Sequence, residues 1–377
     1  MFYSIPSLGG NVRIMVLDRQ EEEWVSVYDA VGEGNDVAEI DFQMLTDSGR
    51  YSVLIGWERG TSENTSISVY DYTGDQLRVL FESDYSLMLI QDMDQDGIQE
   101  ILLGIYKASS KTGSIRLINE TEEGLESISR VTMDHSITGF LGIEIGDIAP
   151  GQTAVFVDAY VGTSEITTEI MAYTASGTLR ALSGDHGQTG QSFSRSIPVR
   201  CEDINADGIL EIPAAVEVQA AEEFPIEDED EEASHLIQYL QLSNPELLLQ
   251  LEEDLPQQED PAFSFSPVWT GFVSLDYGFR FAFPQNWVGM VDVEKEPDRS
   301  EWVFCLRSDA VEPPALLRIR VYEQDELWDV FDDVTYARLD NRGTYEYYAA
   351  VLQPAEVPAS MQISMEEVEE GFSTIKS

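Results

Sequence analysis

Two short segments carry acidic and amide side chains at a spacing that suits a metal ion. One begins at Asp92 and reads DMDQDGIQE; the other begins at Asp203 and reads DINADGILE. Side chains at positions one, three and five of such a loop converge, and the glycine at position six permits the reversal. Oxygen ligands in this order suit calcium, a hard cation bound at about 2.3–2.6 Å. The predicted ligands are Asp92, Asp94, Asp96, the carbonyl of Ile98, Glu100, Asp203, Asn205, Asp207, the carbonyl of Ile209 and Glu211.

The flanking residues separate both loops from EF-hands. An EF-hand places an acidic closing ligand at position twelve, between helices. Position twelve here is Leu103 or Ala214, and apolar strand-like runs lie on both sides. A turn rich in Asp and Asn without a metal gives a similar local pattern. Because two matching loops occupy equivalent places in a repeat, we expect calcium as the cofactor.

That repeat covers residues 1–220. Four segments share an apolar strand, a glycine-containing loop and a second apolar strand, and hairpin-like stretches separate them. One unit is therefore about four strands in roughly fifty residues, and it buries its sheet faces only by stacking on its neighbours, as in a β-propeller. The loops around Gly49 and Gly151 lack the acidic ligands and are predicted to keep only the turn.

The first hairpin leaves the number of blades open. Residues 12–28 have no Asp/Gly segment before them, and the segment from Ile197 has no clear hairpin after it. Pairing the two would close a ring and remove exposed strand edges. Alternatively, the hairpin belongs to a blade that begins upstream of Met1, which is the interpretation that we favour. We therefore expect a mainly β fold with a partial or small propeller of four to five blades.

The later part of the chain is predicted to be a different domain. Residues 221–262 read as an acidic linker with a short helix that begins at Pro245, after the capping residue Asn244; residues 234–242 suit either a helix or a strand. Residues 263–377 read as a small α+β domain with an antiparallel sheet. Near its end, a capping box at Ser364 precedes a helical apolar stripe formed by Met365, Val368, Phe372 and Ile375.

Two motifs resemble known families. The acidic loops followed by apolar strands resemble FG-GAP/VCBS-type propeller repeats over residues 1–220, and this implies a calcium-stabilised extracellular scaffold. The string Y-G-F-x-F-x-F-P-x-x-W, from Tyr277 to Trp287, resembles the opening of a PsbP-like domain. The combination resembles bacterial surface lipoproteins. It implies an extracellular or cell-surface location, with a lipid anchor in a segment missing from the N-terminus.

Composition narrows the possible partners. The chain has 71 acidic and 21 basic residues, a net charge of −50, so its surface would repel nucleic acid. An apolar content of 43% excludes a disordered chain, and no run of 18 apolar residues predicts a membrane span. The acidity is typical of a solvated surface, or of a salt-rich or calcium-rich habitat.

These observations predict a non-catalytic calcium-binding scaffold or interaction protein whose partner is an unknown protein or glycan at the cell surface. No catalytic residue and no organic cofactor site is predicted. The three histidines, His135, His186 and His235, sit in no pattern that identifies a nucleophile. The alternative is a secreted carbohydrate-binding or carbohydrate-active protein that uses the propeller face, which requires carboxylates or tryptophans converging on one cleft.

Overall fold

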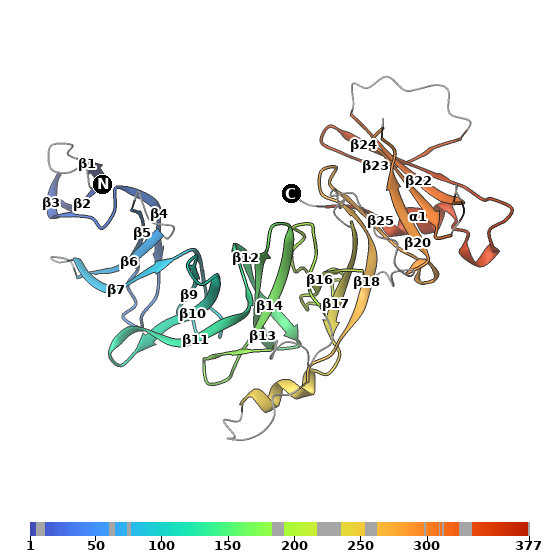
Figure 1. Ribbon diagram of the computed structural model, residues 1–377. Coiled ribbons are helices and arrows are strands. Elements are labelled where there is room, and N and C mark those ends of the chain that lie inside the picture. Colours follow the sequence, from blue (N-terminus) through green and yellow to red (C-terminus); the bar gives the residue numbers. More distant parts are fainter. Residues whose placement is uncertain are drawn as a thin grey trace. The chain divides into compact units, whose positions relative to one another are not determined.

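The computed structural model describes residues 1–4, 12–59, 65–73, 77–182, 192–216, 235–252, 262–297, 299–308, 310, 313–323 and 334–375 (Figure 1). Two compact units emerge from the contacts within the chain. The first comprises Met1–Gln191 and Leu242–Ser264, and the second comprises Ser192–Gln241 and Phe265–Ser377. The most acidic part of the predicted linker, residues 222–232, lies outside the described residues.

The first unit consists of consecutive antiparallel sheets, one for the first hairpin and one for each of the first three predicted repeats, whereas the fourth repeat, from Ile197, belongs to the second unit. A three-stranded sheet, ordered β1-β2-β3, precedes three four-stranded sheets ordered β4-β5-β6-β7, β11-β10-β9-β8 and β12-β13-β14-β15. The strands are β1 (Phe2–Ser4), β2 (Val12–Gln20), β3 (Glu23–Val31), β4 (Asp36–Gln43), β5 (Ser52–Glu58), β6 (Thr65–Tyr72), β7 (Leu77–Tyr85), β8 (Leu87–Gln91), β9 (Glu100–Lys107), β10 (Thr112–Thr121), β11 (Gly124–Ser136), β12 (Gly139–Ala149), β13 (Gln152–Val161), β14 (Glu165–Tyr173) and β15 (Leu179–Ala181). The prediction of four strands in each Asp/Gly repeat is confirmed for three repeats.

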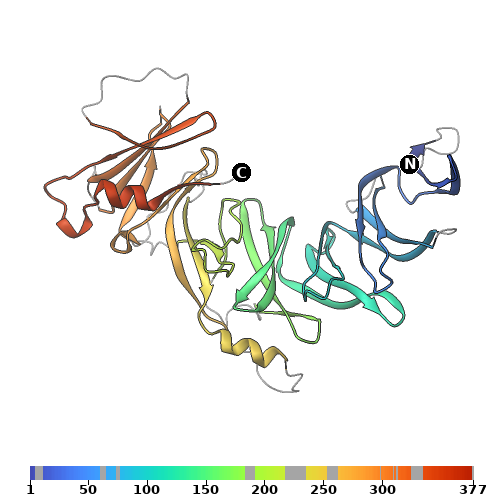
Figure 2. The same ribbon diagram turned by 180° about the vertical axis from the view of Figure 1, so that it is seen from behind.

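Each sheet of this unit buries its apolar face against the next one, as the repeat requires. Val12 and Ile14 of β2 pack with Trp57 of β5, and Leu54 of β5 shares a core with Leu103 of β9. A third core joins the β8–β11 sheet to the β12–β15 sheet. The three four-stranded sheets follow one another in chain order in both views (Figures 1 and 2). Central strands such as β5, with neighbours on both edges, carry nearly continuous buried runs.

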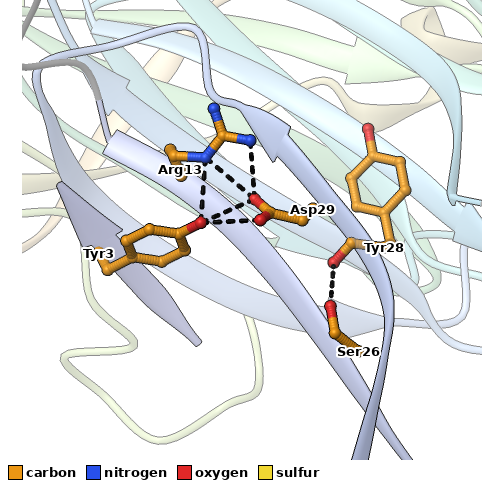
Figure 3. A network of polar contacts seen from close by, with 5 residues as sticks. All are labelled: Tyr3, Arg13, Ser26, Tyr28 and Asp29. Atoms are coloured by element: carbon orange, nitrogen blue, oxygen red, sulfur yellow. Dashed lines mark hydrogen bonds and ion pairs between the residues drawn. The ribbon is translucent and has the colours of Figure 1, made fainter. Parts of the chain in front are cut away.

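The first hairpin belongs to a sheet of its own, with β1 on its edge. Tyr3 of β1 donates its hydroxyl to Asp29 of β3, at 3.0 and 2.8 Å from the two carboxylate oxygens. Arg13 of β2 donates from Nε to the same carboxylate at 3.0 Å (Figure 3). The hydrogen bonds from Tyr3 and Arg13 lower the pKa of Asp29. Because β2 and β3 pair only with each other and with β1 among the described strands, the ring-closing alternative, in which this hairpin pairs with the segment from Ile197, is not seen.

The second unit contains two five-stranded antiparallel sheets, ordered β16-β17-β18-β19-β25 and β20-β21-β22-β24-β23. The alternative of a strand at residues 234–242 is confirmed, because β17 pairs with β16. The first sheet therefore joins strands from both sides of the predicted linker of residues 221–262. The strands are β16 (Ile212–Ala215), β17 (Leu236–Leu242), β18 (Phe265–Ser274), β19 (Phe279–Ala282), β20 (Val291–Lys295), β21 (Glu301–Leu306), β22 (Ala315–Glu323), β23 (Ala337–Arg342), β24 (Tyr345–Val351) and β25 (Phe372–Thr374).

An aromatic core joins these two sheets. Phe279 and Phe281 of β19 are fully buried against Trp302 and Phe304 of β21. Trp287 lies in the same core and donates its indole N–H to the carbonyl of Met361 at 2.9 Å. The aromatic string around Tyr277 therefore folds mainly as core strand. In the part of the chain that the structure describes, the short helices are η2 (Pro245–Glu252), η3 (Gln285–Trp287), η4 (Ala359–Met361) and α1 (Met365–Gly371).

The end of the chain corrects one prediction. Ser364 caps α1 and forms the predicted capping box with Glu367. However, the helix stops at Gly371, because Phe372–Thr374 forms β25 and pairs with β19. The predicted helical stripe that extends through Phe372 and Ile375 is therefore wrong, since pairing at the open edge of the sheet replaces the last helical turn. A mainly β fold with propeller-like repeats and an α+β end is otherwise confirmed.

A buried ionic cluster lies in the β20–β23 sheet. Glu301 is fully buried and pairs with Arg320, which is 4% exposed, and with Arg318 at 3.0 Å. Tyr336 donates its hydroxyl to Glu301 at 2.8 Å. Removing one member of such a group leaves an uncompensated buried charge.

Within the described residues, no helix has the length and apolarity needed to cross a membrane.

Candidate metal centres

The first acidic loop connects β8 to β9 and coils around one carboxylate. The backbone N–H groups of Asp96 and Gly97 donate to the two oxygens of Asp92, at 3.1 and 2.9 Å. The N–H of Asp96 also donates to Oδ1 of Asp94 at 3.2 Å. Gln95 and Gly97 have φ angles of 63° and 91°, the left-handed conformations that close so short a coil.

The second acidic loop precedes β16 and repeats this geometry. The N–H groups of Asp207 and Gly208 donate to the two oxygens of Asp203, each at 2.9 Å. The N–H of Asp207 donates to Oδ1 of Asn205 at 2.9 Å. Ala206 and Gly208 have φ angles of 62° and 88°. The shared motif therefore specifies one backbone conformation in two different sheets.

Three carboxylates converge in each loop. In the first loop, oxygens of Asp92, Asp94 and Glu100 lie within 4.8 Å of one another. In the second loop, oxygens of Asp203, Asp207 and Glu211 do the same. Like charges this close repel one another, and a divalent cation between them would replace the repulsion by attraction. The donor set is oxygen only, which fits the predicted calcium.

The remaining predicted ligands lie beside these clusters. Asp96 turns one oxygen back to accept from the N–H of Ile98 at 2.7 Å, and Asp207 accepts likewise from Ile209 at 2.9 Å. The Asn205 amide nitrogen lies 3.2 Å from oxygens of both Asp207 and Glu211. The ligand roles of Asp96, Asn205 and the carbonyls of Ile98 and Ile209 stay predictions.

The closing glutamates are the most buried members of the clusters. Glu100 is 1% exposed and Glu211 is 0% exposed. Each accepts one hydrogen bond from the backbone near the start of its loop, from Met93 at 2.8 Å and from Ile204 at 2.9 Å. Burial, followed by the neighbouring aspartates, raises the pKa of both side chains to about 7. A cation at this place would compensate a charge that burial otherwise disfavours.

Two amide side chains from neighbouring strands support the clusters. Asn119 of β10 donates to Glu100 at 3.2 Å, and Gln241 of β17 donates to Asp207 at 2.8 Å. Neither residue was predicted from the sequence, because each lies far from its loop along the chain and meets it only through strand pairing. No motif marks either position.

A tyrosine that the sequence analysis also missed lies beside the first loop. Tyr173, at the end of β14, and Asp94 line the same cavity of about 290 Å³. The Tyr173 hydroxyl is buried and has no hydrogen-bond partner of good geometry among the described residues. Burial, followed by the negative charges of Glu100 and Asp94, raises its pKa. The neighbouring sheet therefore places a buried hydroxyl donor beside Asp94 of the acidic cluster.

The two eroded loops keep the turn, as predicted. Gly49 and Gly151 both have a φ of 69°. In the loop around Gly49, the hydroxyls of Thr46 and Ser48 lie 2.9 Å apart where acidic side chains would stand. Asp147 accepts from the N–H of Gly151 at 2.9 Å. Of the described residues, only those of the other two loops bring three metal-binding side chains together.

The described histidines make contacts within the fold. His135 Nδ1 lies 3.0 Å from a carboxylate oxygen of Glu169, whose side chain is 3% exposed. His235 Nδ1 lies 2.9 Å from the carbonyl oxygen of Val273, so this nitrogen carries the proton. His186 lies outside the described residues.

Comparisons with known proteins add little to this picture. No protein-family model matches the chain, and no curated protein matches it. Among solved structures, a rhamnogalacturonan lyase from Bacillus licheniformis has 11% identity and a TM-score of 0.35, over 79% of this chain and 64% of that chain. The chain thus spans less than two thirds of that lyase.

Two further solved structures show a similar degree of likeness. The exotype rhamnogalacturonan lyase YesX has 10% identity and a TM-score of 0.36, over 92% of this chain and 74% of that chain. A protein from Lactobacillus plantarum has 12% identity and a TM-score of 0.28, over 84% and 88%. Identities and TM-scores this low carry no argument about the function of this chain.

Proposed function

We propose that this chain is a non-catalytic calcium-binding protein in which two bound calcium ions stabilise propeller-like sheets for an interaction or scaffold role. One observation carries the proposal. Two loops in different sheets share a sequence, a hydrogen-bond pattern and a buried closing glutamate, Glu100 or Glu211. Bringing these groups together is costly without a cation, because each loop gathers two aspartates around a buried glutamate.

Calcium in the first loop would act as a clamp between two strands. Asp92 directly follows β8, and Glu100 is the first residue of β9, where it pairs with Gln91. An ion held by both carboxylates ties the ends of these strands together across the loop. Binding to the native state alone adds RT ln(1 + [Ca]/Kd), about 2.7 kcal/mol at a hundredfold excess over Kd.

Calorimetric titration with calcium tests the proposal. The wild type should show two binding events, and Asp94→Ala and Asp207→Ala should each remove a different one. Asp147→Ala, in an eroded loop with the same turn, is the matched control and should keep both events. Unchanged stoichiometry in Asp94→Ala and Asp207→Ala would show that these loops do not hold calcium.

The location and family are also part of the proposal. The acidic loops support membership of the FG-GAP/VCBS type of repeat, and the aromatic string from Tyr277 to Trp287 supports a PsbP-like end. Together they support an extracellular, lipid-anchored protein that binds an unknown protein or glycan at the cell surface. Fractionation of producing cells tests the location: the chain should sediment with membranes and be released by detergent, and recovery in the soluble cell extract would contradict it.

The carbohydrate alternative needs tryptophans or carboxylates converging on a cleft. Of the tryptophans in the latter part of the chain, Trp287 and Trp302 are buried in the aromatic core, and Trp269 packs against Tyr239. Trp328 lies outside the described residues. In the propeller-like sheets Trp57 is buried, and Trp24 of β3 is exposed without another described tryptophan of these sheets exposed beside it. No specific observation therefore favours the alternative over the calcium scaffold.

A further inference from the structure

A second candidate binding site lies in the second unit, apart from both acidic loops. It is a cavity of about 240 Å³. Two aromatic rings, two carboxylates and one ammonium group face it. The lining residues are Asp276, Tyr277, Lys295, Ser300, Val321, Glu323 and Tyr345.

The aromatic side of the cavity is rigid. Tyr277 packs edge to face against Trp302 with 5.0 Å between ring centroids, and its ring centroid lies 5.6 Å from that of Tyr345. Ser300 donates its hydroxyl to the Tyr277 hydroxyl at 2.8 Å, and Tyr347 donates to the Tyr277 carbonyl at 2.8 Å. Trp302 itself is only 5% exposed in the aromatic core. The rings are therefore held in place before any ligand arrives.

An ammonium group of the chain already faces these rings. Lys295 Nζ lies 5.4 Å from the ring centroid of Tyr277 and 5.7 Å from that of Trp302. Both distances fall within the range of cation–π attraction. No carboxylate of a described residue forms an ion pair with Lys295, although Asp276 and Glu323 line the same cavity. Lys295 is exposed and ends strand β20, so its side chain can leave without disturbing the core.

The charges around the rings favour a cation over an anion. Two exposed acidic side chains, Asp276 and Glu323, and one basic side chain, Lys295, line the cavity, and Glu323 has a further interaction of its own. The chain as a whole carries a net charge of −50. Both the local and the global field therefore attract positively charged ligands and repel negatively charged ones.

We propose that this cavity is an aromatic cage for an external ammonium group, and that Lys295 occupies it in the absence of ligand. The rings of Tyr277 and Trp302 would face the cation, and Asp276 and Glu323 would stabilise its charge from the rim. The ligand class is a small quaternary or primary ammonium compound, or a lysine side chain of a partner. Lys295 then acts as an internal competitor that the ligand displaces.

Nuclear magnetic resonance of the full-length protein tests the proposal with choline as the probe. The chain has six tryptophans, and their indole N–H signals report separately, with Trp302 assigned from the loss of its signal in Trp302→Phe. Choline, titrated at constant ionic strength, should shift the Trp302 signal saturably and leave most of the others in place. The neutral carbon analogue 3,3-dimethylbutan-1-ol has the same shape and should give no saturable shift.

Variants distinguish specific choline binding in the cage from the general attraction of a cation to an acidic protein. Lys295→Ala should tighten choline binding by about two- to fivefold, the factor that an exposed cation–π contact represents. Lys295→Arg keeps a cation over the rings and should not tighten it. Adding Tyr277→Leu to Lys295→Ala should abolish the shift; Tyr345→Leu, at a half-buried rim position, serves as the second ring variant if the first fails to fold.

The rim is tested by a matched pair of exposed acids. Asp276→Asn should weaken choline binding, whereas Glu294→Gln should not, because Glu294 precedes Lys295 on β20 and so points to the opposite face. A lysine model compound, N-acetyl-lysine methylamide, then distinguishes a partner side chain from a free quaternary ligand. The proposal is overturned if the neutral analogue binds as well as choline, or if Lys295→Ala leaves the affinity unchanged.

Discussion

Asp94→Asn is the most informative single change in the first acidic loop, because the second loop already contains the substitution. Asn205 stands at the equivalent position, and its Oδ1 accepts from the N–H of Asp207 at 2.9 Å. Oδ1 of Asp94 accepts the corresponding bond from Asp96 at 3.2 Å. The variant therefore preserves the loop backbone and removes one negative charge. Any effect on stability or calcium affinity then reports that charge.

The magnitude follows from the carboxylate cluster. Two unit charges 4.8 Å apart repel by about 3 kcal/mol at an effective dielectric constant of about 20 and by about 1 kcal/mol in water. Asp94 is exposed, so we expect the lower part of this range, about 1–2 kcal/mol. In a chelator, the variant should thus melt about 2–8 °C higher than the wild type.

The stabilisation that bound calcium adds should be smaller in this variant than in the wild type. Calcium affinity depends on the number of charged ligands, and we expect about tenfold weaker binding to the Asp94→Asn loop. At a calcium concentration a hundredfold above the wild-type Kd, the stabilisation from this loop falls from about 2.7 to about 1.4 kcal/mol. The reverse change, Asn205→Asp, should lower the melting temperature in chelator. It should also increase the rise in melting temperature that calcium produces.

Differential scanning calorimetry of the two variants and the wild type, with calcium and with a chelator, measures both effects. Asp147→Asn in the eroded loop is the control and should change neither quantity, because no cluster surrounds it. Two results together would refute the convergence of charges on a calcium site. They are a melting temperature of Asp94→Asn in chelator that is no higher than that of the wild type, and a rise in melting temperature with calcium as large as that of the wild type.

Four further predictions concern the acidic loops, a tyrosine beside the first loop and the second unit. Tyr173→Phe should weaken calcium binding at the first loop several-fold and leave the second loop unchanged, since outer partners orient metal ligands; equal titrations would contradict this. The pKa of Glu100 and Glu211 is raised above the unfolded value to about 7, so the stability of the metal-free protein should fall as pH rises from about 5 through 7. Calcium binding at pH 6.5 should accordingly release protons, seen as buffer-dependent heats, and heats independent of the buffer would exclude it. Glu301→Ala should cost about 3–5 kcal/mol in urea unfolding because it removes the buried carboxylate that pairs with Arg320, whereas the exposed Glu294→Ala should stay within about 0.5 kcal/mol; equal effects would contradict the buried pair.

Local sequence patterns were enough to predict the repeats and the acidic loops. Each strand pair is marked by an apolar run on either side of a glycine turn, and the φ angles of 91° at Gly97 and 88° at Gly208 explain why glycine stands there. The loop motif also predicts its own backbone, because its hydrogen bonds join residues no more than seven positions apart. These features depend on nearby residues alone.

Features that depend on strand pairing could not be predicted. Asn119, Tyr173 and Gln241 reach the acidic loops from other strands, and nothing in their local sequence differs from an ordinary strand residue. The end of α1 could not be predicted for the same reason. The spacing of Phe372 and Ile375 continues a helical pattern, yet this segment forms strand β25 and pairs with the open edge of β19. Tertiary pairing outweighs local periodicity at both places.

Equilibrium dialysis against calcium-45 tests the central claim most directly, because it counts ions bound to the intact chain without relying on any variant. We predict two calcium ions per chain at saturation, one for each loop that gathers three carboxylates. They should be lost together when a chelator is added. A chain that binds no calcium, or only one ion, at concentrations that saturate oxygen-ligand sites would contradict the assignment of both loops as calcium centres.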